Sequence, residues 1–131
     1  MDQGTLVSEQ IDAGAKLVAD FGHYKPLRAA FWIKDPDDRE WYLCLASDQI
    51  NDTNFDLAYG EVNRLVRPMS NLWLDPFQVK VMGADHPMAK AVIELTEKYP
   101  GICPIRLRSR RLGNITVDDA FVYPVPTAVG V

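Results

Sequence analysis

The chain has 131 residues, of which 47% are hydrophobic and 24% are charged, and one domain of this size can bury a core without disulfides or metal. Its net charge is −4, from 14 basic and 18 acidic residues, which argues against a dedicated nucleic-acid-binding domain. No apolar run approaches the ~18 residues of a membrane span, and the first residues do not resemble a signal peptide. We therefore expect one cytoplasmic domain over residues 1–131, with a core over 5–124 and a loose tail over 125–131.

Apolar residues recur at two different periods along the chain. Spacings of three and four residues predict helices over 7–21, 55–66 and 88–99, and Gly22 suits the position just after the first helix. Alternation predicts hairpins over 29–46 and 105–123, with a further strand over 77–82. The element order is therefore helix, strand, strand, helix, strand, helix, strand, strand.

These elements indicate an α/β (α+β) fold of a single two-layer domain. We expect a mixed five-stranded sheet that contains two antiparallel hairpins, with the helices mainly on one face. The sequence leaves open whether the strand over 77–82 lies between the hairpins.

The first predicted hairpin is rich in aromatic residues. Asp35-Pro36-Asp37-Asp38 has the residues of a tight turn. A four-residue loop would place Trp32 opposite Trp41, and such aromatic pairs stabilise a sheet. Both faces of this hairpin carry bulky side chains, so one face is either covered by Trp73 from the later connection or forms a partner surface. Trp32, Trp41 and Trp73 are therefore the candidate residues of an aromatic protein interface or homodimer contact.

The last predicted hairpin carries the most organised charge. Arg106, Arg108 and Arg110 alternate with apolar or small residues, so a regular strand would place all three on one face, and Arg111 would extend the patch. A two-residue loop at Gly113-Asn114 would place Arg108 opposite Asp119.

The same register leaves two arginines without an acidic residue opposite. Arg106 would face Phe121 and Arg110 would face Val117, so these two charges would remain unneutralised by the hairpin. Two interpretations follow: a solvated strand face that fixes register, or a site for an anionic ligand or partner.

No recognisable catalytic or metal motif is present. Asp35, Asp37 and Asp38, and likewise the polar group at 52–56, lack the glycine and glutamate of a calcium-binding loop. His23 and His86 have no nucleophile or second histidine at motif spacing. We therefore expect no cofactor and no metal.

Two other groups of residues leave alternatives open. Cys44 and Cys103 lie in apolar, strand-like surroundings, which predicts two buried free thiols, although neighbouring strands would allow a disulfide. Asp118 and Asp119 are the candidates for an acid/base pair if the protein is an enzyme with a dispersed site.

Several segments resemble a group of small bacterial proteins of unknown function. The similar segments span most of the chain: Ala30-Phe-Trp-Ile, Glu40-Trp-Tyr-Leu, Phe77-Gln-Val-Lys-Val, Asp85-His-Pro, Pro100-Gly-Ile, Ile105-Arg-Leu and Val117-Asp-Asp-Ala-Phe-Val-Tyr123. The resemblance implies an α/β fold and no activity, and it does not extend to Arg108, Arg110 and Arg111.

Three functions remain after these exclusions. The sequence favours a non-enzymatic protein-interaction module whose partner is another protein or a second copy. One alternative is binding of nucleic acid or a phosphate ligand through Arg106, Arg108, Arg110 and Arg111. The other is an enzyme with an aspartate-based site.

Overall fold

The computed structural model describes residues 6–69 and 73–125. The elements are α1 (Ser8–Tyr24), β1 (Ala29–Lys34), β2 (Trp41–Ser47), α2 (Phe55–Val66), two 3-10 helices (Arg67–Met69 and Pro76–Gln78), β3 (Val79–Gly83), α3 (Pro87–Lys98), β4 (Ile105–Leu112) and β5 (Ile115–Val122). The predicted order of helices and strands is confirmed. The tail expected over 125–131 lies, from residue 126, outside the described residues. None of the helices described is long and apolar enough to cross a membrane.

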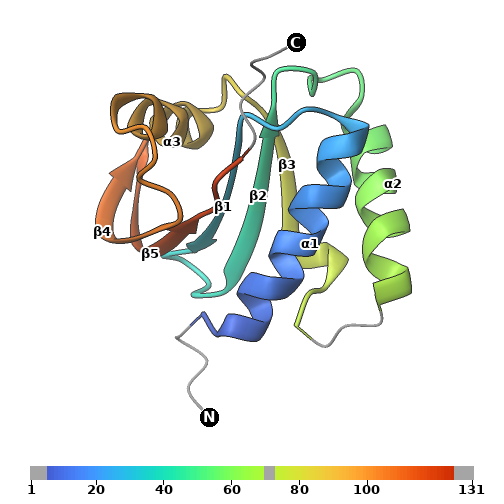
Figure 1. Cartoon of the computed structure of the whole chain (residues 1–131), viewed down its shortest axis with the longest axis horizontal. Coiled ribbons are helices and arrows are strands. Elements are labelled where there is room, and N and C mark those ends of the chain that lie inside the picture. Colours follow the sequence, from blue (N-terminus) through green and yellow to red (C-terminus); the bar gives the residue numbers. More distant parts are fainter. Residues whose placement is uncertain (1–5, 70–72, 126–131) are drawn as a thin grey trace.

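All five strands form one mixed sheet in the order β3-β2-β1-β5-β4 (Figure 1). β2 and β3 are parallel, and the other neighbours are antiparallel. The chain between β2 and β3 passes through α2, because parallel strands need a long crossover connection. β3 lies at one edge, which answers the question left open by the sequence, and the two hairpins meet where β1 pairs with β5.

The helices cover both faces of the sheet. α1 and α2 share one face, as expected, where they pack on side chains that include Ala30, Trp32, Leu43 and Val81. α3 packs on the opposite face, so the protein has three layers where the sequence predicted two. The reason is that β1 is buried at every position, so apolar side chains on both of its faces require a cover.

The first hairpin has a longer loop than the turn residues predict. Lys34 pairs with Trp41 and Trp32 pairs with Leu43, so the expected pairing of Trp32 with Trp41 is wrong. The Asp35 amide donates a hydrogen bond to the Glu40 carbonyl at 2.9 Å, which closes a six-residue loop from 35 to 40. A φ of 61° at Arg39 turns the chain at a position that the sequence pattern does not mark.

A hydrogen-bonded seam holds α1 against the sheet. Trp32 Nε1 donates to the Tyr123 hydroxyl at 2.8 Å, and this hydroxyl donates to the Ile11 carbonyl at 2.6 Å. Gly14 makes the close approach possible, since a Cβ at this position would lie 2.3 Å from the Tyr123 hydroxyl. The seam ties α1 to Trp32 of β1 and to Tyr123, and α1 and α2 lie on the side of the molecule away from β4 (Figure 1).

Candidate functional site

The arginine strand β4 changes face in its middle. Leu107 and Leu112 are both buried in the α3-side cluster, although two residues five positions apart on a regular strand point to opposite faces. Ser109 has a φ of 48°, a left-handed conformation that interrupts the alternation. The expectation that Arg106, Arg108 and Arg110 share one face is therefore wrong.

The four arginines divide between the two faces of the sheet. Arg106 lies opposite Phe121, which packs against the cluster under α1 and α2. Arg110 lies opposite Val117, which belongs to the cluster under α3. Because side chains alternate on either side of the interruption, Arg108 shares the face of Arg106, and Arg111 returns to it. One face of the sheet therefore carries Arg106, Arg108 and Arg111, and the opposite face carries Arg110.

Arg106 is neutralised within the hairpin. Its Nε and Nη2 atoms lie 3.0 and 2.9 Å from the two carboxylate oxygens of Asp119, and its guanidinium lies over the ring of Trp41. The hydrogen bond to Asp119 raises the pKa of Arg106. The predicted register is confirmed, but the prediction of an unneutralised Arg106 is wrong, because a long side chain reaches its diagonal neighbour across the strands.

The other three arginines of β4 keep their charge exposed. Arg108, Arg110 and Arg111 form no ion pair with any residue that the structure describes. Arg111 uses its Nε to bond the Gly113 carbonyl at 3.1 Å, which positions the side chain without neutralising it. Three uncompensated cations on one edge strand therefore remain as the charged part of the candidate surface.

The two aspartates proposed as an acid/base pair are both engaged by arginine. Asp119 binds Arg106, and Asp118 lies 3.5 Å from Arg39. Neither aspartate lines any of the three cavities described below. None of these three cavities therefore provides the enzyme alternative with a cleft beside its carboxylates.

The three tryptophans of the candidate aromatic interface differ in how far they are buried. Trp32 is fully buried and Trp41 is only 3% exposed, because α1 and α2 cover their face of the hairpin. Trp73 is 41% exposed. Phe77, which the sequence assigns only to a strand, is 90% exposed. Trp32 and Trp41 therefore stabilise the core and do not form an exposed partner surface.

A large apolar groove lies between α1 and β5. It has a volume of about 940 Å³, and its walls include Ala15, Ala19 and Gly22 of α1, Phe121 of β5, and Tyr123, which follows β5. It exists because α1 and α2 sit over β1, β2 and β3 and leave this part of the sheet uncovered.

Small residues at helical spacing on α1 are the sequence feature that marks this groove. Ala15, Ala19 and Gly22 recur at helical spacing, and all three are exposed. The sequence pattern places Gly22 just after the first helix, whereas α1 continues to Tyr24. Small side chains do not by themselves reveal whether a helix face is buried or open.

A second cavity lies on the other side of the segment that follows β5. It has a volume of about 660 Å³ and is lined by residues of α3 and by Cys103. Arg28 contributes to both cavities and binds Asp48 and Glu97 at 2.9 and 3.3 Å. Both bonds raise the pKa of Arg28, and the Asp48 bond contributes most.

The two cysteines are free, as predicted, but they differ in burial. Cys44 is fully buried, and burial raises the pKa of its thiol to about 12. Cys103 is only half-buried, so the prediction of two buried thiols holds for Cys44 alone. Burial also raises the pKa of Cys103. Neither environment favours the thiolate that cysteine chemistry requires.

The third cavity, of about 420 Å³, lies beside β3 and the residues that follow it. Asp52, Asp85 and His86 line it. His86 is the N-cap of α3, and its Nδ1 accepts a hydrogen bond from the Met88 amide at 3.1 Å. Among the described residues, no group of three His, Cys, Asp or Glu side chains could hold a metal ion.

The comparisons with known proteins found no match. The sequence fits no family model, and neither a curated protein nor a solved structure is similar to it.

Proposed function

We propose that this chain is a non-enzymatic interaction module that binds a second copy or another protein through the groove between α1 and β5. The observation that carries the proposal is the groove itself, an open apolar groove with a volume of about 940 Å³ beside an exposed helix face of small residues. Contiguous exposed apolar surface on a protein often marks an interaction site.

The polar groups around the groove favour a protein partner over a small molecule. A small-molecule site needs several convergent polar groups that are free to bind the ligand. Here the guanidinium of Arg28 is already bound to Asp48 and Glu97, and the Tyr123 hydroxyl is bound to Trp32 and the Ile11 carbonyl. His23 and Gln49 are the other polar residues of the lining besides Asp48, and the rest of the surface offers shape and apolar area, which suit a helix or strand of another chain.

Two glycines provide a matched test of the groove. Gly22 lies in the groove wall on α1, Gly60 lies on α2, and a side chain at either position would meet no atom within 4 Å. Gly22→Arg and Gly60→Arg therefore make the same change of residue and charge, and each is expected to stabilise its helix by less than the ~0.8–1 kcal/mol of a change from glycine to alanine. Only Gly22→Arg places a charged side chain in the groove.

Sedimentation velocity of the two variants distinguishes the outcomes. We expect the unaltered chain and Gly60→Arg to associate at high protein concentration, and Gly22→Arg to remain monomeric. If the unaltered chain is monomeric, a specific protein partner must be lost on Gly22→Arg and retained on Gly60→Arg. Equal behaviour of the two variants would remove the groove as the interaction site.

A second candidate function is the binding of an anionic ligand by β4. It is supported by the exposed charges of Arg108, Arg110 and Arg111, which no described acidic residue neutralises. Arginine binds phosphate and carboxylate groups in a planar, bidentate geometry. Titration with phosphate or a single-stranded oligonucleotide should then show an affinity that falls linearly with salt on logarithmic scales, and binding that does not depend on salt would exclude this candidate.

A further inference from the structure

The outer edge of β4 is open. β4 is the last strand of the sheet and pairs only with β5. Apart from that ladder, residues 105–112 make no backbone hydrogen bond to any segment that the structure describes. The outward N–H and C=O groups of such a strand can pair with a strand from another chain.

The opposite edge of the sheet is covered by a side chain. The Val81 amide of β3 donates a hydrogen bond to the Tyr59 hydroxyl of α2 at 3.2 Å. The bond therefore occupies the outward-pointing N–H of Val81, which lies in the middle of the five-residue strand β3. The two edges are therefore unequal, and β4 is the more accessible one.

The interruption at Ser109 does not prevent strand pairing. β5 pairs with Leu107 and Arg108 before it and with Arg110 and Arg111 after it, without a change of register. A strand on the outer side of β4 can follow the same path, because one partner strand already does so along both halves.

The charges of β4 select among possible partner strands. Arg108 and Arg111 are exposed on one face and Arg110 on the other, and none forms an ion pair with a described residue, because Asp119, which lies opposite Arg108, binds Arg106. Like charges on an edge strand repel basic segments and discourage pairing with identical edges. Acidic side chains opposite these arginines would remove the repulsion and stabilise the pair.

We propose that the outer edge of β4 binds an extended acidic segment of a partner protein as an added strand. The inference rests on the second candidate function, the binding of an anionic ligand by β4. It identifies that ligand as an acidic segment of another protein. An added strand presents alternate side chains to both faces of the sheet, as the three arginines do. A single-stranded nucleic acid follows one basic groove, and the interruption at Ser109 leaves only two of the three unpaired arginines, Arg108 and Arg111, on one face.

The test uses a fluorescent peptide of glutamate, valine and threonine, with about ten residues so that it spans the eight residues of β4 at ~3.3 Å each. Two further versions carry N-methyl groups on alternate amides, one version for each edge of the peptide. Because an added strand uses only one of its edges, one version should bind about tenfold more weakly and the other should bind like the parent. A peptide with lysine in place of glutamate should not bind.

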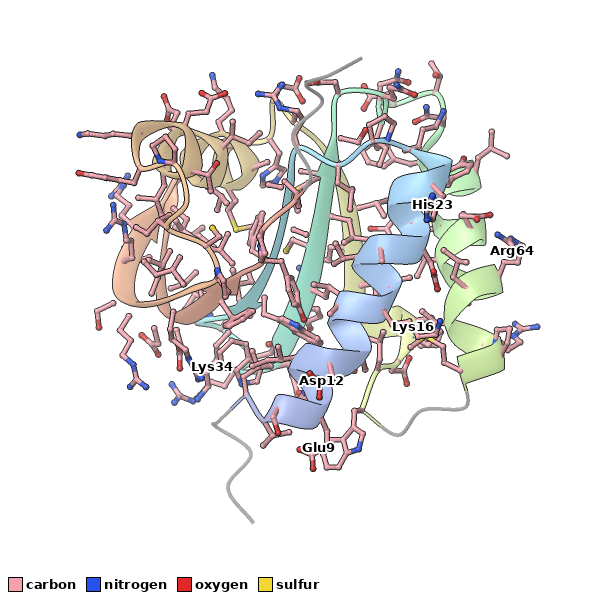
Figure 2. The ribbon with its side chains drawn as sticks, in the orientation of Figure 1. Glu9, Asp12, Lys16, His23, Lys34 and Arg64 are labelled. Atoms are coloured by element: carbon pink, nitrogen blue, oxygen red, sulfur yellow. The ribbon has the colours of Figure 1, made fainter. Side chains whose placement is uncertain are left out.

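Protein variants locate the binding. Arg108→Gln with Arg110→Gln should weaken binding of the acidic peptide about tenfold, while Arg64→Gln should leave it unchanged. Arg64 is an exposed arginine that points outward from α2, on the side of the protein away from β4 (Figure 2). Unchanged thermal unfolding of the double variant would show that the loss is not a loss of fold.

Three results would overturn the inference. If both N-methylated peptides bind like the parent, attraction is electrostatic only and no strand is added. If a thymidine oligonucleotide binds more tightly than the peptide, β4 is a polyanion site and only the second candidate function survives. If neither probe binds at low salt, both are lost, and the groove proposal is unaffected because Gly22→Arg tests it separately.

Discussion

The two sides of α1 each carry a glycine, but the space around the two glycines differs. Gly14, on the inner side, leaves room for the Tyr123 hydroxyl, and a Cβ there would lie only 2.3 Å from it. Gly22, on the outer side, has no atom within 4 Å of the position that a Cβ would occupy. The inner side is therefore constrained by contacts with β1 and β5, while the outer side remains open beside the groove.

This contrast separates stability from function along a single helix. Substitutions on the inner side disturb the seam that orients α1, so their effects should appear in unfolding measurements. Substitutions on the outer side should leave the fold intact and act only on association. The following changes test that separation, from the largest expected effect to the smallest.

Replacing the buried tryptophan of the seam should have the largest effect. Trp32→Ala removes a fully buried indole and the hydrogen bond to Tyr123, and we expect a loss of about 3–5 kcal/mol in the free energy of unfolding. Phe77→Ala is the control, because this side chain is 90% exposed and should cost less than about 0.5 kcal/mol. Similar losses in urea unfolding would contradict the assignment of Trp32 to the core.

Gly14→Ala should destabilise the protein even though alanine is the better helix former. The added Cβ would force apart α1 and the Tyr123 hydroxyl, with an expected net cost of about 2–3 kcal/mol. Thermal unfolding measures this cost. A neutral or stabilising result would show that α1 can move away from the sheet without loss.

Removing the Tyr123 hydroxyl should have a smaller effect. Tyr123→Phe keeps the ring but leaves Trp32 Nε1 without its acceptor, and we expect a cost of about 1–2 kcal/mol. The double variant of Tyr123→Phe with Gly14→Ala checks the mechanism by chemical unfolding. It should cost less than the sum of the single changes, because the added methyl group no longer meets a hydroxyl.

Gly22→Ala should stabilise the protein slightly. Alanine improves helix propensity by about 0.8–1 kcal/mol, and no neighbouring atom opposes the added methyl group. Gly60→Ala on α2 should give a matching gain for the same reason. A loss of stability for Gly22→Ala alone would mean that the groove wall is not open.

Two tyrosines should resist ionisation for different reasons. Burial raises the pKa of Tyr123 to about 12, whereas the pKa of Tyr42 is raised to about 12 chiefly by its hydrogen bond to Asp38. Folding raises both pKa values, so the protonated form of each tyrosine is favoured in the folded protein. The resulting contribution to the free energy of unfolding is complete below the unfolded pKa of about 10, and it is lost as the pH rises toward 12. The same bond lowers the pKa of Asp38.

Ultraviolet titration of the phenolates distinguishes the two causes. Asp38→Asn should lower the pKa of Tyr42 and leave that of Tyr123 unchanged, and Tyr123→Phe should remove the other late step. A titration curve that is unchanged by Asp38→Asn would contradict the role of the surface hydrogen bond.

The sequence by itself determined the elements, their order and the register of the last hairpin. Alternation in β4 and β5, with the two-residue turn at Gly113-Asn114, correctly places Arg108 opposite Asp119. These features depend on residues close together in the chain, where periodicity and turn chemistry act directly.

Only the tertiary structure decided which side chains are exposed and which charges are neutralised. The φ of Ser109 divides the arginines between two faces, Asp119 binds its diagonal neighbour Arg106, and the helices bury Trp32 while the groove stays open. Periodicity identifies an apolar or charged position but does not show what lies across from it. That depends on how distant segments pack, because exposure and ion pairing are set by neighbours from other parts of the chain.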